Sequence, residues 1–420
     1  MYKKLLVALI LVLFSAIGLA ETLDIDVEYI SYADNKPVSF KCQVDSNIRP
    51  SVQAVGFNHG GTLLGAGSYG HVVVWDLKKA SLAKRIGVGD IQGAVQCLAF
   101  SNDGKWIAIG DGVASQSGAV RIFDVNSKEQ LFCFSQPGDI VYSLALTKDG
   151  KFVAAGSADG NVYVWDIAGK KLVQKFDKHS GMVMSVAFDS TGKFMISGST
   201  DKTVCLYDVE KWEYLKNIKL DASVNGICFA NKDKVILAIV GGSENAIKTI
   251  NTNNYKVSKT IKVASEPLSM VYIEKMGRLL VGCADGNVMA YNAWNGSFLK
   301  KLDGHDRYCY GIVASADGEK VASSGADGLV KVYRSYNGVK IATLADLDFR
   351  DNQWLIVTAR GHYSCSDGVQ LKWLDFKGEP MPEKMVQRLK DSAIAAQVFV
   401  VQNNNKATQK NKNNKPTKKK

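Results

Sequence analysis

One short segment recurs along this chain, and the recurrence constrains the fold more than any other feature. The clearest copies are LLGAGSYGHVVVWDL (63–77), VAAGSADGNVYVWDI (153–167), MISGSTDKTVCLYDV (195–209), LLVGCADGNVMAYNA (279–293) and VASSGADGLVKVYRS (321–335). Two weaker copies end in VRIFDV (120–125) and IKTINT (247–252). One large side chain recurs every 41 to 48 residues, at Trp75, Phe123, Trp165, Tyr207, Ile250, Tyr291 and Tyr333. Such a period is typical of a small unit that stacks on copies of itself.

Each unit predicts four short strands. A strand–turn–strand phrase such as VYSLALTKDGKFVAAG (141–156) precedes most copies, and a Gly/Asp turn, a third strand, a polar linker and a fourth strand follow it. Four strands at a period near 42 residues suit a propeller blade. We therefore predict an all-β fold: a seven-bladed β-propeller of four-stranded antiparallel blades over residues 37–344, with eight blades as the alternative.

The first copy also matches the dinucleotide-binding pattern GxGxxG, at Gly65, Gly67 and Gly70. That pattern binds a pyrophosphate only where the glycines lead from a strand into a helix. Here a β-branched run, HVVVW (71–75), follows Gly70 and predicts a strand. We interpret these glycines as turn and close-packing residues of the repeat.

Over residues 40–340 the chain resembles the WD-repeat β-propeller family. The resemblance is carried by Trp75-Asp76, Trp165-Asp166, the relaxed pairs Phe123-Asp124 and Tyr207-Asp208, and Gly304-His305. It implies a structural polar network of His, Ser or Thr, Asp and Trp in each blade. Two blades have three of the four residues, with Tyr207 or Tyr333 in place of Trp: His179, Ser197, Asp201 and His305, Ser323, Asp327. Because buried polar groups stabilise only when all are satisfied, we expect moderate stability.

Segments beyond the repeats have separate predictions. Because the family usually lends a terminal strand to the opposite end, PVSFKCQV (37–44) is expected to complete the last blade. Residues 345–376 are interpreted as a β-rich extension or a degenerate eighth blade, since Trp373 lies 40 residues after Tyr333. Residues 383–400 predict one amphipathic helix with a single apolar stripe at Met385, Leu389, Ala393, Ala396 and Val400.

Both termini carry charge of one sign. Residues 1–20 have two lysines, an apolar run and small residues before Ala20, which is typical of a cleaved signal peptide; an uncleaved anchor is the alternative. We expect an exported chain, periplasmic or secreted. Residues 402–420 are Lys/Asn-rich and predicted to be disordered, with possible contact to an anionic surface. These ends account for most of the net charge of +11, so the body gives no sign of specific nucleic-acid binding.

Catalytic motifs are not found in the sequence. Its five histidines are not at metal-ligand spacing, and no nucleophile elbow or phosphate loop occurs. Most of the eight cysteines lie in apolar, strand-like runs, which favours buried free thiols over disulfides. We expect no cofactor, no metal and no enzymatic activity. The alternative is an enzyme, or a binder of a small sugar or peptide, that uses the central channel.

The family commonly contacts partners through residues at the start of each innermost strand. Aligning the repeats places Gln53, Gln96, Tyr142, Met184, Asn225, Ser269 and Tyr310 there, with Arg307 and Tyr308 beside them. Aromatic residues, Met and Arg are enriched at interface centres. We predict a monomeric, non-catalytic scaffold that binds an unidentified protein through this rim; the alternative is that some of these aromatics pack between blades. The longer turn at 111–120 is expected to rise over the rim as a mobile lip.

Overall fold

The computed structural model describes residues 21–30, 37–46, 50–348, 350–375, 380–381 and 383–400. The predicted signal peptide (1–20) and Lys/Asn-rich tail (402–420) lie outside these ranges. Within them, no helix has the length and apolar character needed to span a membrane.

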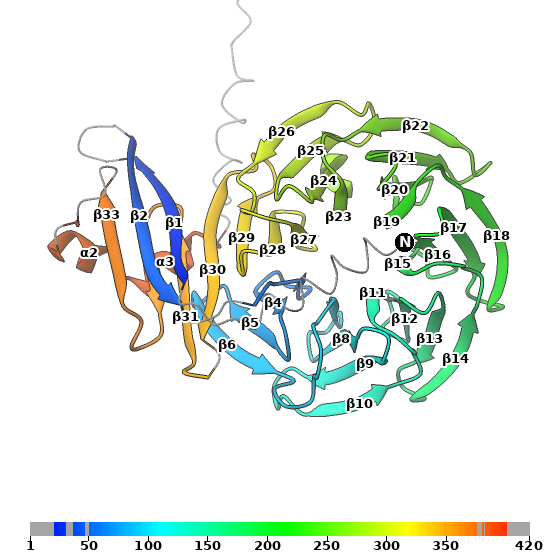
Figure 1. The fold of residues 1–420 in the computed structure, drawn as a ribbon, viewed down its shortest axis with the longest axis horizontal. Coiled ribbons are helices and arrows are strands. Elements are labelled where there is room, and N and C mark those ends of the chain that lie inside the picture. Colours follow the sequence, from blue (N-terminus) through cyan, green and yellow to red (C-terminus); the bar gives the residue numbers. More distant parts are fainter. Residues whose placement is uncertain are drawn as a thin grey trace, which may run out of the picture.

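Seven antiparallel sheets stand around a central axis as the blades of a propeller (Figure 1). Blades one to three are β3 (Ala54–Phe57), β4 (Leu63–Gly67), β5 (Val72–Asp76), β6 (Ser81–Ile86); β7 (Cys97–Phe100), β8 (Trp106–Val113), β9 (Ser117–Asp124), β10 (Gln130–Phe134); and β11 (Val141–Leu146), β12 (Phe152–Ser157), β13 (Val162–Asp166), β14 (Lys171–Phe176). The expected all-β propeller is confirmed.

Blades four to seven follow the same order. They are β15 (Val183–Phe188), β16 (Phe194–Ser199), β17 (Thr203–Asp208), β18 (Glu213–Lys219); β19 (Ser223–Ala230), β20 (Val235–Gly241), β21 (Ala246–Asn251), β22 (Val257–Lys262); β23 (Pro267–Ile273), β24 (Arg278–Cys283), β25 (Val288–Asn292), β26 (Phe298–Leu302); and β27 (Cys309–Ala314), β28 (Lys320–Gly325), β29 (Leu329–Arg334), β30 (Lys340–Asp348). In blade six, a short 3₁₀ turn, η2 (Glu274–Met276), joins β23 to β24.

The recurring large residue explains why the blades stack. Trp75, Phe123, Trp165, Tyr207 and Tyr333 are all nearly inaccessible to solvent. Each lies in the third strand and contributes to an apolar core; Phe123, for example, packs with Val72 and Val74 of the preceding blade. Burying one large aromatic or aliphatic side chain stabilises by about 1.5–3 kcal/mol, so the repeat period fixes a series of equivalent inter-blade cores.

The ring closes without a lent strand, so the assignment of 37–44 to the last blade was wrong. The innermost strands of blades seven and one, β27 and β3, pack side by side, and Val52 N donates to Gly325 O at 3.1 Å. The segment instead belongs to β2 (Pro37–Ser46), which pairs with β1 (Glu21–Ile30) and β33 (Leu371–Asp375). That strand buries Cys42 and Val44 in a core shared with Leu347 and Leu355.

Residues after the seventh blade extend it. β31 (Gln353–Thr358) and β32 (Tyr363–Cys365) continue the sheet of blade seven outwards. The β1–β2–β33 sheet lies beside this extension and outside the ring (Figure 1), and Leu23, Ile25 and Trp373 pack against Leu347 and Leu355. This segment therefore adds no eighth blade to the ring.

The predicted single helix is two short helices, α2 (Glu383–Leu389) and α3 (Ser392–Gln397). The break occurs at Asp391, whose extended backbone and side-chain carboxylate cap α3 by accepting a hydrogen bond from Ile394 N at 2.9 Å. Because this capping geometry lies outside the helical region, one continuous helix cannot pass through Asp391. α3 buries Ala395 and Ala396 against blades one and seven.

Candidate functional site

The alternation of strands places two kinds of loop at the same end of every blade. The linkers that enter each first strand and the turns between second and third strands lie together there; for example, Asp159 of one such turn accepts a hydrogen bond from Gly138 N of a linker at 2.9 Å. We call this end the entry face. It contains the residues predicted to bind a partner.

Four of the predicted rim residues lie at one structural feature, a bulge near the start of the innermost strand of a blade. The pairing register shifts around Tyr142, Met184, Asn225 and Tyr310. Gln53 and Gln96 occupy the equivalent places just before β3 and β7. All six are half-buried. A bulge re-aims its extra residue, so these side chains leave the regular alternation of the strand.

Ser269 was placed on this ring wrongly, because in blade six the register shifts between Pro267 and Ser269 and the residue at the bulge is Leu268. Ser269 instead links two blades: its hydroxyl donates to Cys309 O at 3.3 Å. Two other serines one residue past a bulge do the same, since Ser143 and Ser185 accept from backbone amides of the following blade at 3.1 Å. We define the mouth as Gln53, Gln96, Tyr142, Met184, Asn225, Leu268 and Tyr310.

In blade seven a second tyrosine, Tyr308, and a cation, Arg307, lie beside Tyr310 of the mouth. Tyr308 and Tyr310 stack with ring centroids 5.7 Å apart, and Arg307 is exposed. Burial raises the pKa of Tyr310, with a smaller contribution from Tyr308; burial also raises the pKa of Tyr142, followed by the nearby charge of Asp139. Both phenols are therefore neutral donors near pH 7.

Sequence reasoning missed exposed apolar residues on the loops of the entry face. Tyr69 is 60% exposed and Val88 55%, and Met182 is 41% exposed. Tyr69 follows β4 and the other two lie in linkers between blades. Their signal in the sequence was an apolar residue in a Gly- or Ser-rich loop. Together with the mouth, they give this end an apolar character.

The long hairpin of blade two is not a free lip. Ser115 N donates to Asp139 Oδ1 at 2.8 Å and Gly118 N donates to Pro137 O at 3.2 Å, which ties the hairpin to the linker entering blade three. A Cβ atom on Gly118 would lie 2.0 Å from Asp139 O, so only glycine allows this approach. The expectation of a mobile lip is corrected: the hairpin is a packed part of the entry face.

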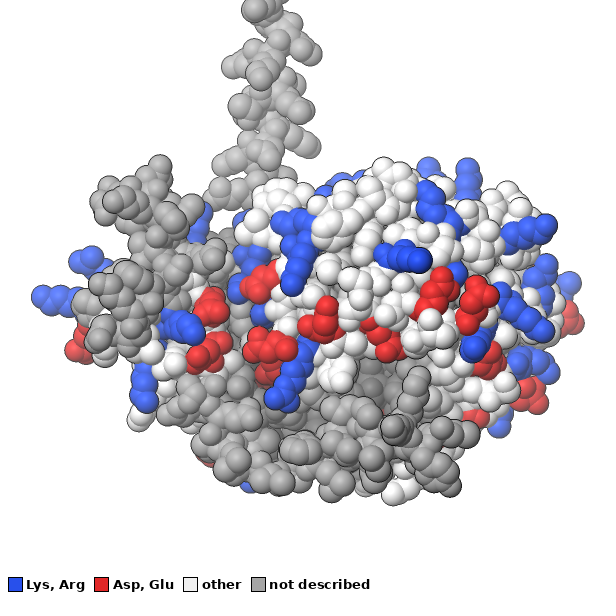
Figure 2. Space-filling view, turned by 45° about the horizontal axis from the view of Figure 1, so that its top comes forward, with Lys and Arg blue, Asp and Glu red and all other residues white. Residues whose placement is uncertain are grey.

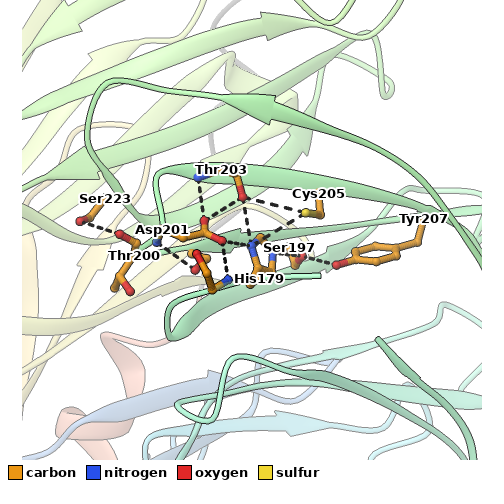
Figure 3. A network of polar contacts seen from close by, with 10 residues as sticks. His179, Ser197, Thr200, Asp201, Thr203, Cys205, Tyr207 and Ser223 are labelled. Atoms are coloured by element: carbon orange, nitrogen blue, oxygen red, sulfur yellow. Dashed lines mark hydrogen bonds and ion pairs between the residues drawn. The ribbon is translucent and has the colours of Figure 1, made fainter. Parts of the chain in front are cut away.

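The predicted polar network is present in blade four (Figure 3). His179 Nδ1 lies 2.9 Å from Asp201 Oδ2, and His179 Nε2 lies 2.7 Å from Ser197 Oγ. The Tyr207 hydroxyl lies 2.9 Å from Ser197 Oγ and takes the place of the missing Trp. Burial lowers the pKa of His179, against the attraction of Asp201. Burial works to raise the pKa of Asp201, but hydrogen bonds from Thr203 and the charge of His179 hold it below its usual value.

Blade seven repeats this arrangement. His305 Nδ1 lies 2.9 Å from Asp327 Oδ1, His305 Nε2 lies 2.7 Å from Ser323 Oγ, and the Ser323 hydroxyl lies 3.1 Å from that of Tyr333. The side chains of His179 and His305 have no exposed surface. Both networks therefore stabilise loops of the entry face and offer no access to a substrate.

In three other blades an acid near the end of the second strand, or in the turn after it, accepts a hydrogen bond from a side chain of the third strand, which sequence reasoning did not anticipate. Arg121 Nε donates to Asp111 Oδ2 at 3.0 Å, Tyr163 OH donates to Asp159 Oδ2 at 2.8 Å, and Lys248 Nζ donates to Glu244 Oε1 at 3.0 Å. All three donors lie two residues before the recurring large residue. A charged residue inside an apolar run, as in AVRIFD or AIKTIN, was the available signal.

Within the described ranges we also considered a surface groove, groups of metal-binding side chains and the cysteine thiols. A groove of about 600 Å³ lies on the outer wall between β6 and β31, lined by Lys84, Arg85 and Trp354 among others. Both cations are already engaged there, Lys84 with Val125 O and Arg85 with Asp346. No group of three His, Cys, Asp or Glu side chains is placed to hold a metal within the described ranges. All eight cysteines are free thiols, and burial raises the pKa of Cys228 and Cys283 to about 12.

Comparison with known proteins agrees with this geometry. Residues 85–124, 128–166, 170–208 and 296–334 match the family model "WD domain, G-beta repeat". These four units are similar to WD repeats. Each matched range runs from the outer strand of one blade to the third strand of the next, so one matched unit spans two neighbouring blades.

Two individual proteins are similar to parts of the chain. Over 133 residues, 31% of this chain, it is 24% identical to the Periodic tryptophan protein 2 homolog of Dictyostelium discoideum, and the match spans 14% of that protein's length. One chain of a crystal structure of the Mitotic Checkpoint Complex superposes with a TM-score of 0.62 at 18% identity, covering 67% of this chain and 86% of that one. At this identity the likeness shows the fold alone.

Proposed function

We propose that this WD-repeat propeller is an exported, non-catalytic scaffold that binds a protein partner through the entry face, with the mouth as the centre of the contact. The observation that carries the proposal is the ring of half-buried side chains held at the bulges, where Tyr142, Met184, Leu268 and Tyr310 offer apolar surface.

Preorganisation of this ring supports the proposal. Ser143 and Ser185, each one residue past a bulge, bond to the next blade, and the buried His179 and His305 networks hold the surrounding loops. A surface that is already ordered loses little conformational entropy on binding. Aromatic residues in such partly desolvated positions typically contribute most of the energy of an interface.

The termini fit the same proposal. The apolar segment at residues 1–20 would direct export, and the lysines of 402–420 would add a weak attraction to an anionic surface. The propeller would then act in the cell envelope or outside the cell, as a monomer that presents its entry face.

The test compares Tyr142→Ala and Tyr310→Ala with Tyr336→Ala, an aromatic truncation at a 57% exposed side chain on the opposite end. Proteins captured by the wild type from envelope extract are identified, and the dissociation constant of the leading candidate is measured for each variant. Each mouth variant is expected to weaken binding by about 1–2 kcal/mol with an unchanged unfolding midpoint, while Tyr336→Ala binds normally. Normal binding by both mouth variants, or loss only through unfolding, would contradict the proposal.

A further inference from the structure

The two ends of the propeller differ in their balance of charge. At the end opposite the entry face, some lysines pair with acids, as in Lys193–Glu210 at 3.2 Å. Further exposed lysines there, such as Lys148, Lys211 and Lys232, form no ion pair within the described ranges. On the entry face, the acids that form no ion pair within the described ranges include Asp90, Asp139, Glu266, Asp285 and Asp306. Among the described residues of its loops, the Lys and Arg side chains that likewise form no ion pair are Lys202 and Arg307.

These five acids belong to different blades and so surround the mouth. Asp90, Asp139, Glu266 and Asp306 lie in linkers that enter blades two, three, six and seven, and Asp285 lies in a turn of blade six. In Figure 2 acidic side chains form a row across the middle of the view, and most of the Lys and Arg in view lie above it or at the right. Like charges around a shared opening add to one negative potential.

We infer that the partner of the entry face is a basic polypeptide segment: one that places a bulky apolar side chain in the mouth and Lys or Arg residues against the surrounding acids. The inference rests on the proposed function and names the chemistry of the partner. The mouth would receive the apolar side chain of the partner, because the half-buried side chains of Tyr142, Met184 and Leu268 give it an apolar surface. The acids around the mouth would attract the Lys or Arg residues on either side of that apolar side chain, because charge complementarity steers association.

Other occupants fit less well. A nucleic acid or an anionic membrane would be repelled by these five carboxylates, which form no ion pair within the described ranges. A second copy of the entry face has the same sign of charge, so two entry faces would not pair. The chain's own tail, KATQKNKNNKPTKKK (406–420), has the charge but contains no bulky apolar side chain for the mouth.

The probe for the test is a fluorescent peptide in which Lys and Arg flank a Leu–Phe pair, compared with the same peptide carrying Glu at the basic positions. Binding to the full chain is measured by anisotropy at low salt and at about 0.1 M salt, where charges are screened beyond about 10 Å. We expect the basic peptide to bind and to weaken with salt, and the Glu peptide not to bind. Equal binding of both peptides, or no binding of the basic one, would overturn the inference.

Charge-neutralising variants locate the effect. The triple variant Asp90→Asn, Asp285→Asn, Asp306→Asn is expected to weaken peptide binding roughly five- to tenfold, at a few tenths of a kcal/mol or more per charge. The matched control, Glu129→Gln, Glu213→Gln, Glu274→Gln, removes three exposed acids from outside the entry face and should leave binding unchanged. Equal weakening by both triple variants would assign the effect to net charge alone and overturn the inference.

Two further measurements separate this inference from the proposed function. If Tyr142→Ala and Tyr310→Ala weaken partner capture while the Asn triple variant captures the partner normally, the entry face is a binding site and the basic chemistry is wrong. If residues 402–420 are deleted, peptide affinity is expected to stay the same. A large increase would show that the tail itself occupies the mouth, which would overturn the assignment to a partner segment.

Discussion

At the scale of single residues, tyrosine replaces tryptophan without breaking the polar network. The Tyr207 hydroxyl reaches Ser197 Oγ at 2.9 Å, from a side chain that fills the same apolar core. Because Asp201 is ionised and only accepts, His179 donates to it from Nδ1 and accepts at Nε2 from the Ser197 hydroxyl. The Tyr207 O–H then donates to Ser197, so each polar group in the chain has a partner.

Removing the hydroxyl that closes this network should therefore cost stability. Tyr207→Phe is expected to lower the free energy of unfolding by about 1 kcal/mol, the usual net worth of a hydrogen bond, and Ser197→Ala by more, because it leaves both His179 Nε2 and the Tyr207 hydroxyl buried without their partner. Denaturant titration measures both. Tyr336→Phe, at an exposed side chain, is the control. A Tyr207→Phe protein as stable as the wild type would show that the hydroxyl contributes nothing.

At the scale of elements, the seam between the last and first blades depends on side chains rather than on a lent strand. Asp346 of β30 accepts from His71 Nε2 at 3.0 Å and pairs with Arg85 of β6. The Arg85 side chain is only 10% exposed and also donates to Asn352, at the turn before β31. Hydrogen bonds from His71 and Arg85 outweigh the effect of burial and keep the pKa of Asp346 below its usual value.

The seam predicts a large effect of a single substitution. Asp346→Ala leaves the buried guanidinium of Arg85 without its counter-ion, and breaking a buried pair in this way typically costs about 3–5 kcal/mol. The expected result is a lower unfolding midpoint in a thermal melt. Asp26→Ala is the matched control, since the Asp26 side chain is 78% exposed. Equal melting of the two variants would mean that packing of β27 against β3 closes the ring on its own.

At the scale of the whole molecule, the cleavage predicted after Ala20 would remove none of the described strands. β1 begins at Glu21, the residue after the predicted cleavage site, and the Glu21 backbone pairs with Ser46 in the side sheet. Leu23, Ile25 and Val27 of this strand are buried. A cleaved protein would keep every described strand.

From the small residues Gly18 and Ala20 before this bond, we predict that export of the chain yields a protein that begins at Glu21. Intact-mass measurement of protein from the periplasm or medium should give the mass of residues 21–420. Ala20→Phe should prevent cleavage, because the processing enzyme requires a small residue before the cut. Exported wild-type protein that retains residues 1–20 would contradict the prediction.

The sequence by itself determined the repeat, the four strands of each blade and the residues of two polar networks. Turn chemistry and apolar alternation act over a few residues, and each recurs at every period. The sequence also placed most of the mouth, since Tyr142, Met184 and Tyr310 lie at matching positions of the repeat. It misplaced Ser269 because a bulge shifts register by one residue, and such a shift depends on strand pairing rather than on side-chain pattern.

Only the tertiary structure decided how the ring closes, where 37–44 pairs and what surrounds the mouth. Strand β2 could complete a blade or build a second sheet with the same alternation; burial of Cys42 and Val44 beside Leu347 and Leu355 selected the second. The unpaired acids of the entry face are far apart in sequence, from Asp90 to Asp306. They share one rim because the closed ring brings the linkers of all seven blades to the same end, and only contacts between distant segments produce that arrangement.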